Sequence, residues 1–149
     1  MPHARRIIVT AISMGFFNSL FSGSKGDNAP RFVTDTAFAA NLANQKKMSP
    51  MTLAQLRKLG IAESRSLKLE FFFYTDTNQK AQALATGLKE LNYQVSSGTS
   101  ASDVKKFIIT GWSTPIKMDE TTVVSWTDEM CRLGFKNDAE FDGWGTNAD

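Results

Sequence analysis

The chain has 149 residues, of which 42% are hydrophobic and 21% charged, a composition typical of one globular domain. Its formal net charge is only +2, which argues against a strongly electrostatic partner such as nucleic acid or an anionic membrane. The single cysteine, Cys131, excludes an intramolecular disulfide bond and fits a reducing compartment, so we expect a cytoplasmic location.

The N-terminal residues 1–31 are predicted to form a flexible segment and linker. The run 7–21 is mostly apolar, but it is shorter than the roughly 20 residues of a membrane span and is interrupted by Asn18. No small-residue cleavage site follows it, so we expect neither secretion nor a membrane span. Met14 offers a second possible start, and both starts remain open.

Residues 32–62 are predicted to form a helical extension. We expect two short helices in it, over 35–46 and 49–60. Asp35 can cap the first helix, and Ser49 is a natural cap for the second. Pro50 would then stand at the first helical position, where its missing N–H costs nothing. Gly60 is expected to end the second helix in a left-handed conformation.

The stretch SLKLEFFFY, residues 66–74, is the clearest strand in the predicted domain 63–149. Its side chains alternate with period two, and one set is wholly apolar: Leu67, Leu69, Phe71 and Phe73. That set is predicted to face the core. The other set ends in Phe72 and Tyr74, so part of the second face is expected to be covered or to bind something.

The later elements alternate between helical patterns, with a period of about 3.6 residues, and strand patterns, with a period of about two. They are a helix over 75–92 capped by Asp76, a strand over 93–97, a strand over 105–112, a helix over 118–136 that follows Asp119 and ends at Gly134, and a strand over 139–144. This β–α–β–β–α–β order predicts a ferredoxin-like α+β sandwich with a four-stranded antiparallel sheet and both helices on one face. The two N-terminal helices are expected to cover part of the open face.

Residues that could carry catalysis are sparse. His3 is the only histidine, so no zinc or Cys–His site is recognisable. Cys131 is predicted to be a buried, inert thiol. Two acidic pairs are interpreted as a helix start and a solvated helix face: Asp119–Glu120 and Asp128–Glu129. We therefore predict a protein without catalytic residues, cofactor or metal.

Aromatic residues at strand ends are the better candidates for a binding site. Trp112 and Trp144 each stand beside a glycine at the end of a predicted strand. We expect Trp144 both to lie in the last strand and to present a contact surface, since exposed tryptophan is typical of binding sites. Closure of the core's edge by Trp144 is the alternative.

An RNA-binding function is also open. RNA-recognition domains share this element order and stack bases on aromatic residues of the first and third strands. Phe72, Tyr74 and Trp112 occupy such positions here. However, KKFIITGW does not fit the pattern of the third strand in that class, and the near-neutral charge predicts a weak phosphate contribution. RNA is therefore the second candidate partner.

The ending EFDGWGT, residues 140–146, resembles the C-terminal signature of the RraB family, regulators of ribonuclease E activity. The block FFFYTDT…KAQALATGLKELNYQV, residues 71–95, is similar to the first strand and helix of that family. Together the resemblance covers about residues 66–146. It implies a ferredoxin-like fold and a non-catalytic cytoplasmic regulator that acts on a ribonuclease by protein–protein contact. A small adaptor or immunity-type protein is a further alternative.

The sharpest part of that signature is DGWG, and we expect it to take part in partner binding. In the signature, Gly143 and Gly145 would let the Trp144 indole lie flat, and Asp142 would accept a hydrogen bond from the indole N–H or from a turn amide. The predicted partner-binding residues are Phe72, Tyr74, Trp112, Asp142, Gly143, Trp144 and Gly145.

Overall fold

The computed structural model of the chain describes residues 6–7, 30–100 and 105–147. Its elements are β1 (Arg6–Ile7), α1 (Asp35–Lys58), β2 (Ser66–Leu67), β3 (Leu69–Thr75), α2 (Asn78–Glu90), β4 (Gln94–Thr99), β5 (Phe107–Trp112), β6 (Ile116–Lys117), α3 (Glu120–Lys136) and β7 (Glu140–Asn147). Nearly all of the predicted flexible segment 1–31, with His3 and Met14, lies outside the described residues.

The four long strands form an antiparallel sheet in the order β7-β3-β5-β4, which confirms the predicted four-stranded sheet. The two-residue strand β1 adds to the outer edge of β7, and β2 pairs with β6 in a small separate sheet. The strands β1 and β6 were not expected from the sequence, and β2 was expected as the start of a single strand over 66–74. None of the helices in the described part of the chain combines the length and apolar character that a membrane crossing needs.

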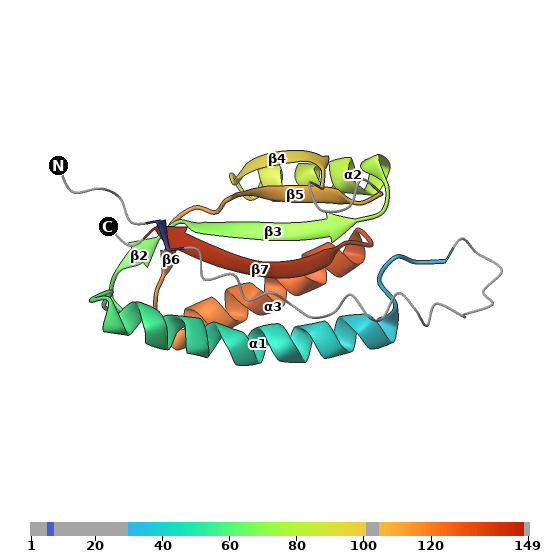
Figure 1. Ribbon diagram of the computed structural model, residues 1–149. Coiled ribbons are helices and arrows are strands. Elements are labelled where there is room, and N and C mark those ends of the chain that lie inside the picture. Colours follow the sequence, from blue (N-terminus) through green and yellow to red (C-terminus); the bar gives the residue numbers. More distant parts are fainter. Residues whose placement is uncertain (1–5, 8–29, 101–104, 148–149) are drawn as a thin grey trace.

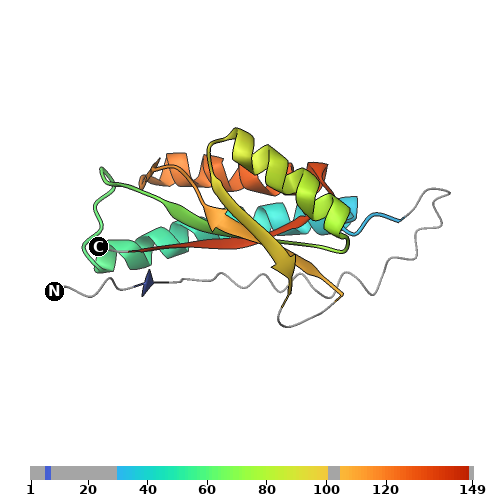
Figure 2. The same cartoon turned by 90° about the horizontal axis from the view of Figure 1, so that it is seen from above.

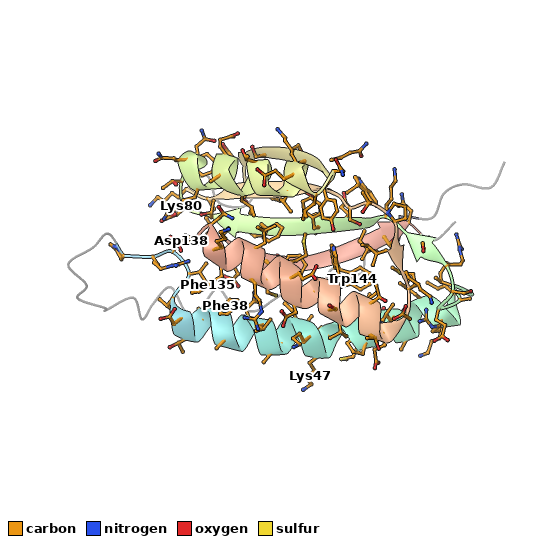
Figure 3. All side chains as sticks on the ribbon, turned by 180° about the vertical axis from the view of Figure 1, so that it is seen from behind. Phe38, Lys47, Lys80, Phe135, Asp138 and Trp144 are labelled. Atoms are coloured by element: carbon orange, nitrogen blue, oxygen red, sulfur yellow. The ribbon has the colours of Figure 1, made fainter. Side chains whose placement is uncertain are left out.

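The helices lie on one side of the sheet. In Figure 1 the strands stand in front of α2 and α3, and α1 runs below β7; in the reverse view of Figure 3, α3 passes in front of the sheet. Helix α1 packs along α3 and contacts β7. The expectation that the N-terminal helices cover the open face is therefore wrong, because α1 extends the helical layer on the other side.

Helix α1 is one continuous helix of 24 residues, so the prediction of two short helices is wrong. Its cap is Thr34, whose hydroxyl accepts from the Ala37 N–H, and Asp35 is already helical. Pro50 lies inside the helix, where it removes one backbone hydrogen bond. Ser49 is 1% exposed and bonds to other elements instead of capping a new helix. Tertiary contacts of this segment thus override the local stop signal.

The end of α1 follows its prediction. Gly60 has φ +88°, and the neighbouring Ile61 N–H donates to the Leu56 carbonyl at 3.0 Å. A glycine takes this left-handed conformation without steric cost, which explains why the helix ends there.

Strand β3 has the predicted alternation. Leu69, Phe71 and Phe73 are fully buried against the helices, which confirms the core-facing set. Leu67 is only half-buried, because residues 66–67 belong to the small β2–β6 sheet. The core continues into the helices with Leu56, Leu84, Leu88, Val123, Trp126 and Met130, among others.

The cap of helix α2 is Thr77, one residue after the predicted cap Asp76. Thr77 accepts from the Lys80 N–H, while the Asp76 carboxylate pairs with the Lys80 ammonium at 2.8 Å. Helix α2 buries Ala81, Leu84, Ala85 and Leu88 against the sheet, whereas Leu91 just after it is 47% exposed. Asn92 ends the helix with φ 66°, as its sequence position indicates.

Helix α3 begins as predicted, since Asp119 accepts from the Thr122 N–H at 2.8 Å. It does not end at Gly134, because it continues to Lys136. A Cβ on Gly134 would lie 2.9 Å from both the Ala139 carbonyl oxygen and the Phe73 ring. The glycine therefore permits close packing of α3 on the sheet rather than ending the helix.

Asp138, in the turn between α3 and β7, joins three separate segments. Its carboxylate accepts the backbone N–H groups of Phe32 and Val33 at 2.9 and 2.8 Å, and the Lys80 ammonium lies 2.7 Å away. Figure 3 shows Lys80 and Asp138 together at one end of the sheet. Although burial of the carboxylate opposes ionisation, these bonds hold the pKa of Asp138 below its usual value. The entry to α1 is fixed by this contact.

Candidate functional site

The sheet face that the described helices leave uncovered is organised in three rows of cross-strand neighbours. In the order β7, β3, β5, β4 the rows are Gly145–Glu70–Trp112–Gln94, Gly143–Phe72–Thr110–Ser96 and Glu140–Tyr74–Ile108–Gly98. Residues that face each other in an antiparallel pair point to the same side of the sheet. We call the surface made by these rows the open face.

Three of the predicted site residues meet on the open face. Phe72 and Tyr74 are two residues apart on β3, and Trp112 is paired with Glu70 on the neighbouring strand β5. All three side chains are half-buried, so each keeps part of its surface available for contact. The structure thus brings together the aromatic residues that the sequence placed on separate strands.

The glycines of the DGWG signature lie on the open face and not beside the indole. Gly143 and Gly145 pair with Phe72 and Glu70, while Trp144 pairs with Phe71 on the helix side. Gly143 has φ 129°, a backbone conformation that residues other than glycine rarely adopt. The expectation that these glycines make room for the indole is therefore wrong. They shape the opposite surface of β7.

A β-bulge explains the position of Asp142. The register between β3 and β7 shifts between Phe72 and Phe73, which pair with Gly143 and Phe141. Asp142 is the extra residue on β7, and such residues bend the strand and redirect a side chain. The bulge therefore sets where the carboxylate of the signature lies.

The Asp142 carboxyl interacts electrostatically with Glu140 and Tyr74 of the open face. Burial and the nearby Glu140 carboxylate raise the pKa of Asp142 to about 7. Burial also raises the pKa of Glu140, and burial together with the Asp142 charge raises the pKa of Tyr74. The Lys106 ammonium partly opposes the shifts at both carboxyls. This end of the open face thus holds two desolvated carboxyl groups whose charged forms are disfavoured.

The raised pKa of Asp142 predicts a dependence of stability on pH. The folded protein binds the proton more tightly than the unfolded chain, whose aspartates titrate near pH 4. Stability from this group is present below about pH 4 and is lost as the pH rises to about 7. We therefore expect Asp142→Asn to be more stable than the natural protein at pH 8, with the difference vanishing near pH 4. Urea unfolding at both pH values measures it, and an unchanged difference between them would contradict the assignment.

Trp144 belongs to the core, 2% exposed, and it lies in β7 as predicted. Its indole N–H donates to the Ser49 hydroxyl oxygen at 3.0 Å, not to Asp142. The Ser49 hydroxyl also bonds to Thr127 at 2.7 Å, so the indole links β7 to both α1 and α3. Trp144 was also expected to present a contact surface, and that expectation is wrong because its side chain is buried. Its role in the fold is to hold β7 from behind the open face.

Helix α1 meets the bulge through side-chain amides. Asn41 donates to the Phe141 carbonyl oxygen at 2.9 Å, and Gln45, one turn later, reaches the same oxygen at 3.4 Å. A bulge leaves backbone groups without a ladder partner, and buried groups of that kind need another one. The amides supply it. This contact was not expected from the sequence, because its partners are about a hundred residues apart.

The reactive side chains outside the open face have structural surroundings in the described part of the chain. No group of three histidine, cysteine or acidic side chains in this part of the chain could hold a metal ion. Cys131 is buried, as predicted, and desolvation raises the pKa of its thiol to about 12, so the thiolate is not populated near neutral pH. Asp119 is a helix cap, and Asp128 pairs with Arg132 at 2.6 Å. The open face is therefore the candidate site.

Some residues of the open face were not recognised in the sequence. Glu70 could have been found, because it shares the parity of Phe72 and Tyr74. Ile108 and Glu140 could not, since their positions depend on strand register and on the bulge.

The family model described as regulator of ribonuclease activity B matches residues 46–146, more than half of the chain. No curated protein matches the chain. The match begins within α1 and includes every row of the open face.

Proposed function

The chain belongs to the RraB family, and we propose that its open face is the surface that binds the ribonuclease. Family membership implies regulation of ribonuclease E activity, and proteins of this family are non-catalytic regulators. The observation that carries the proposal is the meeting of Phe72, Tyr74 and Trp112 on the one sheet face without a described helix. Clustered aromatic side chains are the usual anchors of protein interfaces.

The charge of the open face supports a protein partner over RNA. Three of its carboxylates lie around the aromatic residues: Glu70, Asp142 and Glu140. Lys106 is the cation that acts on the last two. A surface rich in carboxyl groups disfavours phosphate and favours basic side chains, whose positive charge also promotes ionisation of these carboxyls. The proposed contact residues are therefore Phe72, Tyr74, Trp112 and Asp142. Gly143 and Gly145 would offer the backbone of β7 to the partner, and Trp144 would support β7 from the helix side.

Two finer parts of the proposal concern the fold type and the location. We propose a ferredoxin-like sandwich, which the order β7-β3-β5-β4 supports, with α2 and α3 as crossovers on one face. We further propose a cytoplasmic location, because the ribonuclease that the family regulates is cytoplasmic. α1 then serves as an additional helix that supports β7.

Substitutions on the open face test the proposal. Tyr74→Ala and Trp112→Ala should each weaken binding to ribonuclease E by about tenfold, since each removes a large aromatic contact. Met51→Ala is the matched control, because Met51 is 59% exposed on α1 and lies outside the open face. Titration calorimetry with purified ribonuclease E gives the affinities, and circular dichroism shows whether each variant is folded.

Equal affinities of the three variants would refute the open face as the binding surface. Binding of RNA alone by the isolated protein, falling steeply with salt, would instead support the RNA-recognition alternative.

A further inference from the structure

The outer edge of β4 lacks the features that usually protect a sheet edge. Its six residues, QVSSGT, include no charged residue and no proline, and they pair with β5 without a bulge. The opposite edge of the sheet is occupied, because β1 pairs with β7. Figure 2 looks down on this side, and β4 stands in front with no other described element lying across it.

The backbone of β4 presents hydrogen-bonding groups along this edge. The Ser100 N–H donates to the Lys106 carbonyl at 2.9 Å, just beyond the β4–β5 ladder. Because inward and outward groups alternate along an antiparallel strand, the N–H and C=O groups of Val95, Ser97 and Thr99 point away from β5. No described strand pairs with β4 on that side. The edge is thus a template for one more strand.

A hollow of about 260 Å³ adjoins this edge on the open face. Trp112 and Glu70 line its inner side, and Gln94 and Ser96 of β4 line the side toward the edge. Glu70 is the one charged side chain among the described residues that line it. Glu70 is only 7% exposed and already has an interaction partner, so the half-buried indole of Trp112 is the group that attracts a cation here. An indole face suits a lysine or arginine side chain.

Building on the proposed function, we propose that an extended segment of the ribonuclease adds to β4 as a further strand and places a lysine or arginine in this hollow. A strand in that position lies about 5 Å from β4, close enough for a long side chain to pass over Gln94 and Ser96. A second copy of this chain fits less well, because β4 has no lysine or arginine that could fill the hollow. The added strand continues the open face, so one partner would contact both.

A proline at position 97 tests strand addition directly. The Ser97 N–H points outward, so Ser97→Pro removes a donor of the edge without removing a β4–β5 hydrogen bond. The control is Ser97→Ala, which keeps the N–H and, like the proline variant, loses the bond from Gln82 to the Ser97 hydroxyl. We expect Ser97→Pro to bind ribonuclease E at least about tenfold more weakly than Ser97→Ala, with similar melting temperatures.

Two further comparisons complete the test. Thr99→Pro against Thr99→Ala repeats it at the next outward residue if Ser97→Pro fails to fold. Trp112→Leu should weaken binding more than Trp112→Phe, which keeps an aromatic ring for the cation. Equal binding by both members of the proline pair overturns strand addition while leaving the proposed function intact. A natural protein that binds no ribonuclease E overturns both.

Discussion

Replacing Trp144 by alanine is expected to lower the free energy of unfolding by about 3–5 kcal/mol, the usual cost of removing a buried aromatic side chain. The indole is 2% exposed and contacts the Trp126 ring edge to face, with centroids 6.4 Å apart. Alanine would leave a cavity behind the open face. It would also leave Ser49 without the donor that links it to β7.

Trp144→Phe separates the two contributions. Phenylalanine fills most of the cavity but cannot donate to Ser49. We expect the free energy of unfolding to fall by about 1 kcal/mol for the lost hydrogen bond, with a further small loss because phenylalanine is smaller than tryptophan. Urea unfolding followed by far-ultraviolet circular dichroism measures both variants. A Trp144→Ala protein as stable as the natural chain, but unable to bind ribonuclease E, would restore the interpretation of Trp144 as a contact residue.

Gly111→Ala is expected to be a second change with a large effect on stability. A Cβ at this position would overlap the Gln94 carbonyl oxygen and would lie 2.9 Å from the Phe71 ring. The carbonyl is backbone and the ring is in the core, so neither can move without shifting β4 or the core packing. Such overpacking typically costs 1–3 kcal/mol, and we expect about 3 kcal/mol here because backbone must move.

Gly98→Ala is the matched control for that change. Gly98 lies on β4, the strand that pairs with the strand of Gly111, and a Cβ at Gly98 would meet nothing within 4 Å. The substitution should therefore be nearly neutral in the same urea titration, or slightly stabilising. Equal destabilisation by the two substitutions would show that the paired strands β4 and β5 tolerate neither side chain for a reason other than the overlap at Gly111.

The predictable part of the fold is the part that local patterns control. Alternation in 66–74 identified the core face of β3, and the spacing of apolar residues identified α2 and α3. Asp119 and Gly60 were recognised because a cap and a left-handed glycine act within one helical turn. These interactions are short in sequence, so the sequence alone displays them.

The errors arise where distant residues decide. Ser49 followed by Pro50 has the local pattern of a helix start, yet α1 runs through it because Ser49 bonds to Thr127 and Trp144. Gly134 has the pattern of a helix end, yet it permits contact with Phe73. In both cases a tertiary contact outweighs a preference of a few kcal/mol or less.

The candidate site was predictable only in part. The aromatic residues of β3 and β5 were identified from their strand positions, and the structure places them together. The face of Trp144 was not, because the bulge at Asp142 changes the register with which β7 meets β3. A register shift of one residue moves side chains to the other face, and nothing local in DGWG reveals it.

The central claim is our proposal that this protein regulates ribonuclease E by contact through its open face, and we expect that contact to slow cleavage. The most direct measurement is the rate at which purified ribonuclease E cleaves a defined RNA, with and without an excess of this protein. The account predicts slower cleavage with the natural protein and with Met51→Ala, and no effect of a folded Tyr74→Ala/Trp112→Ala double variant. Unchanged cleavage with the natural protein, or equal slowing by the double variant, would contradict it.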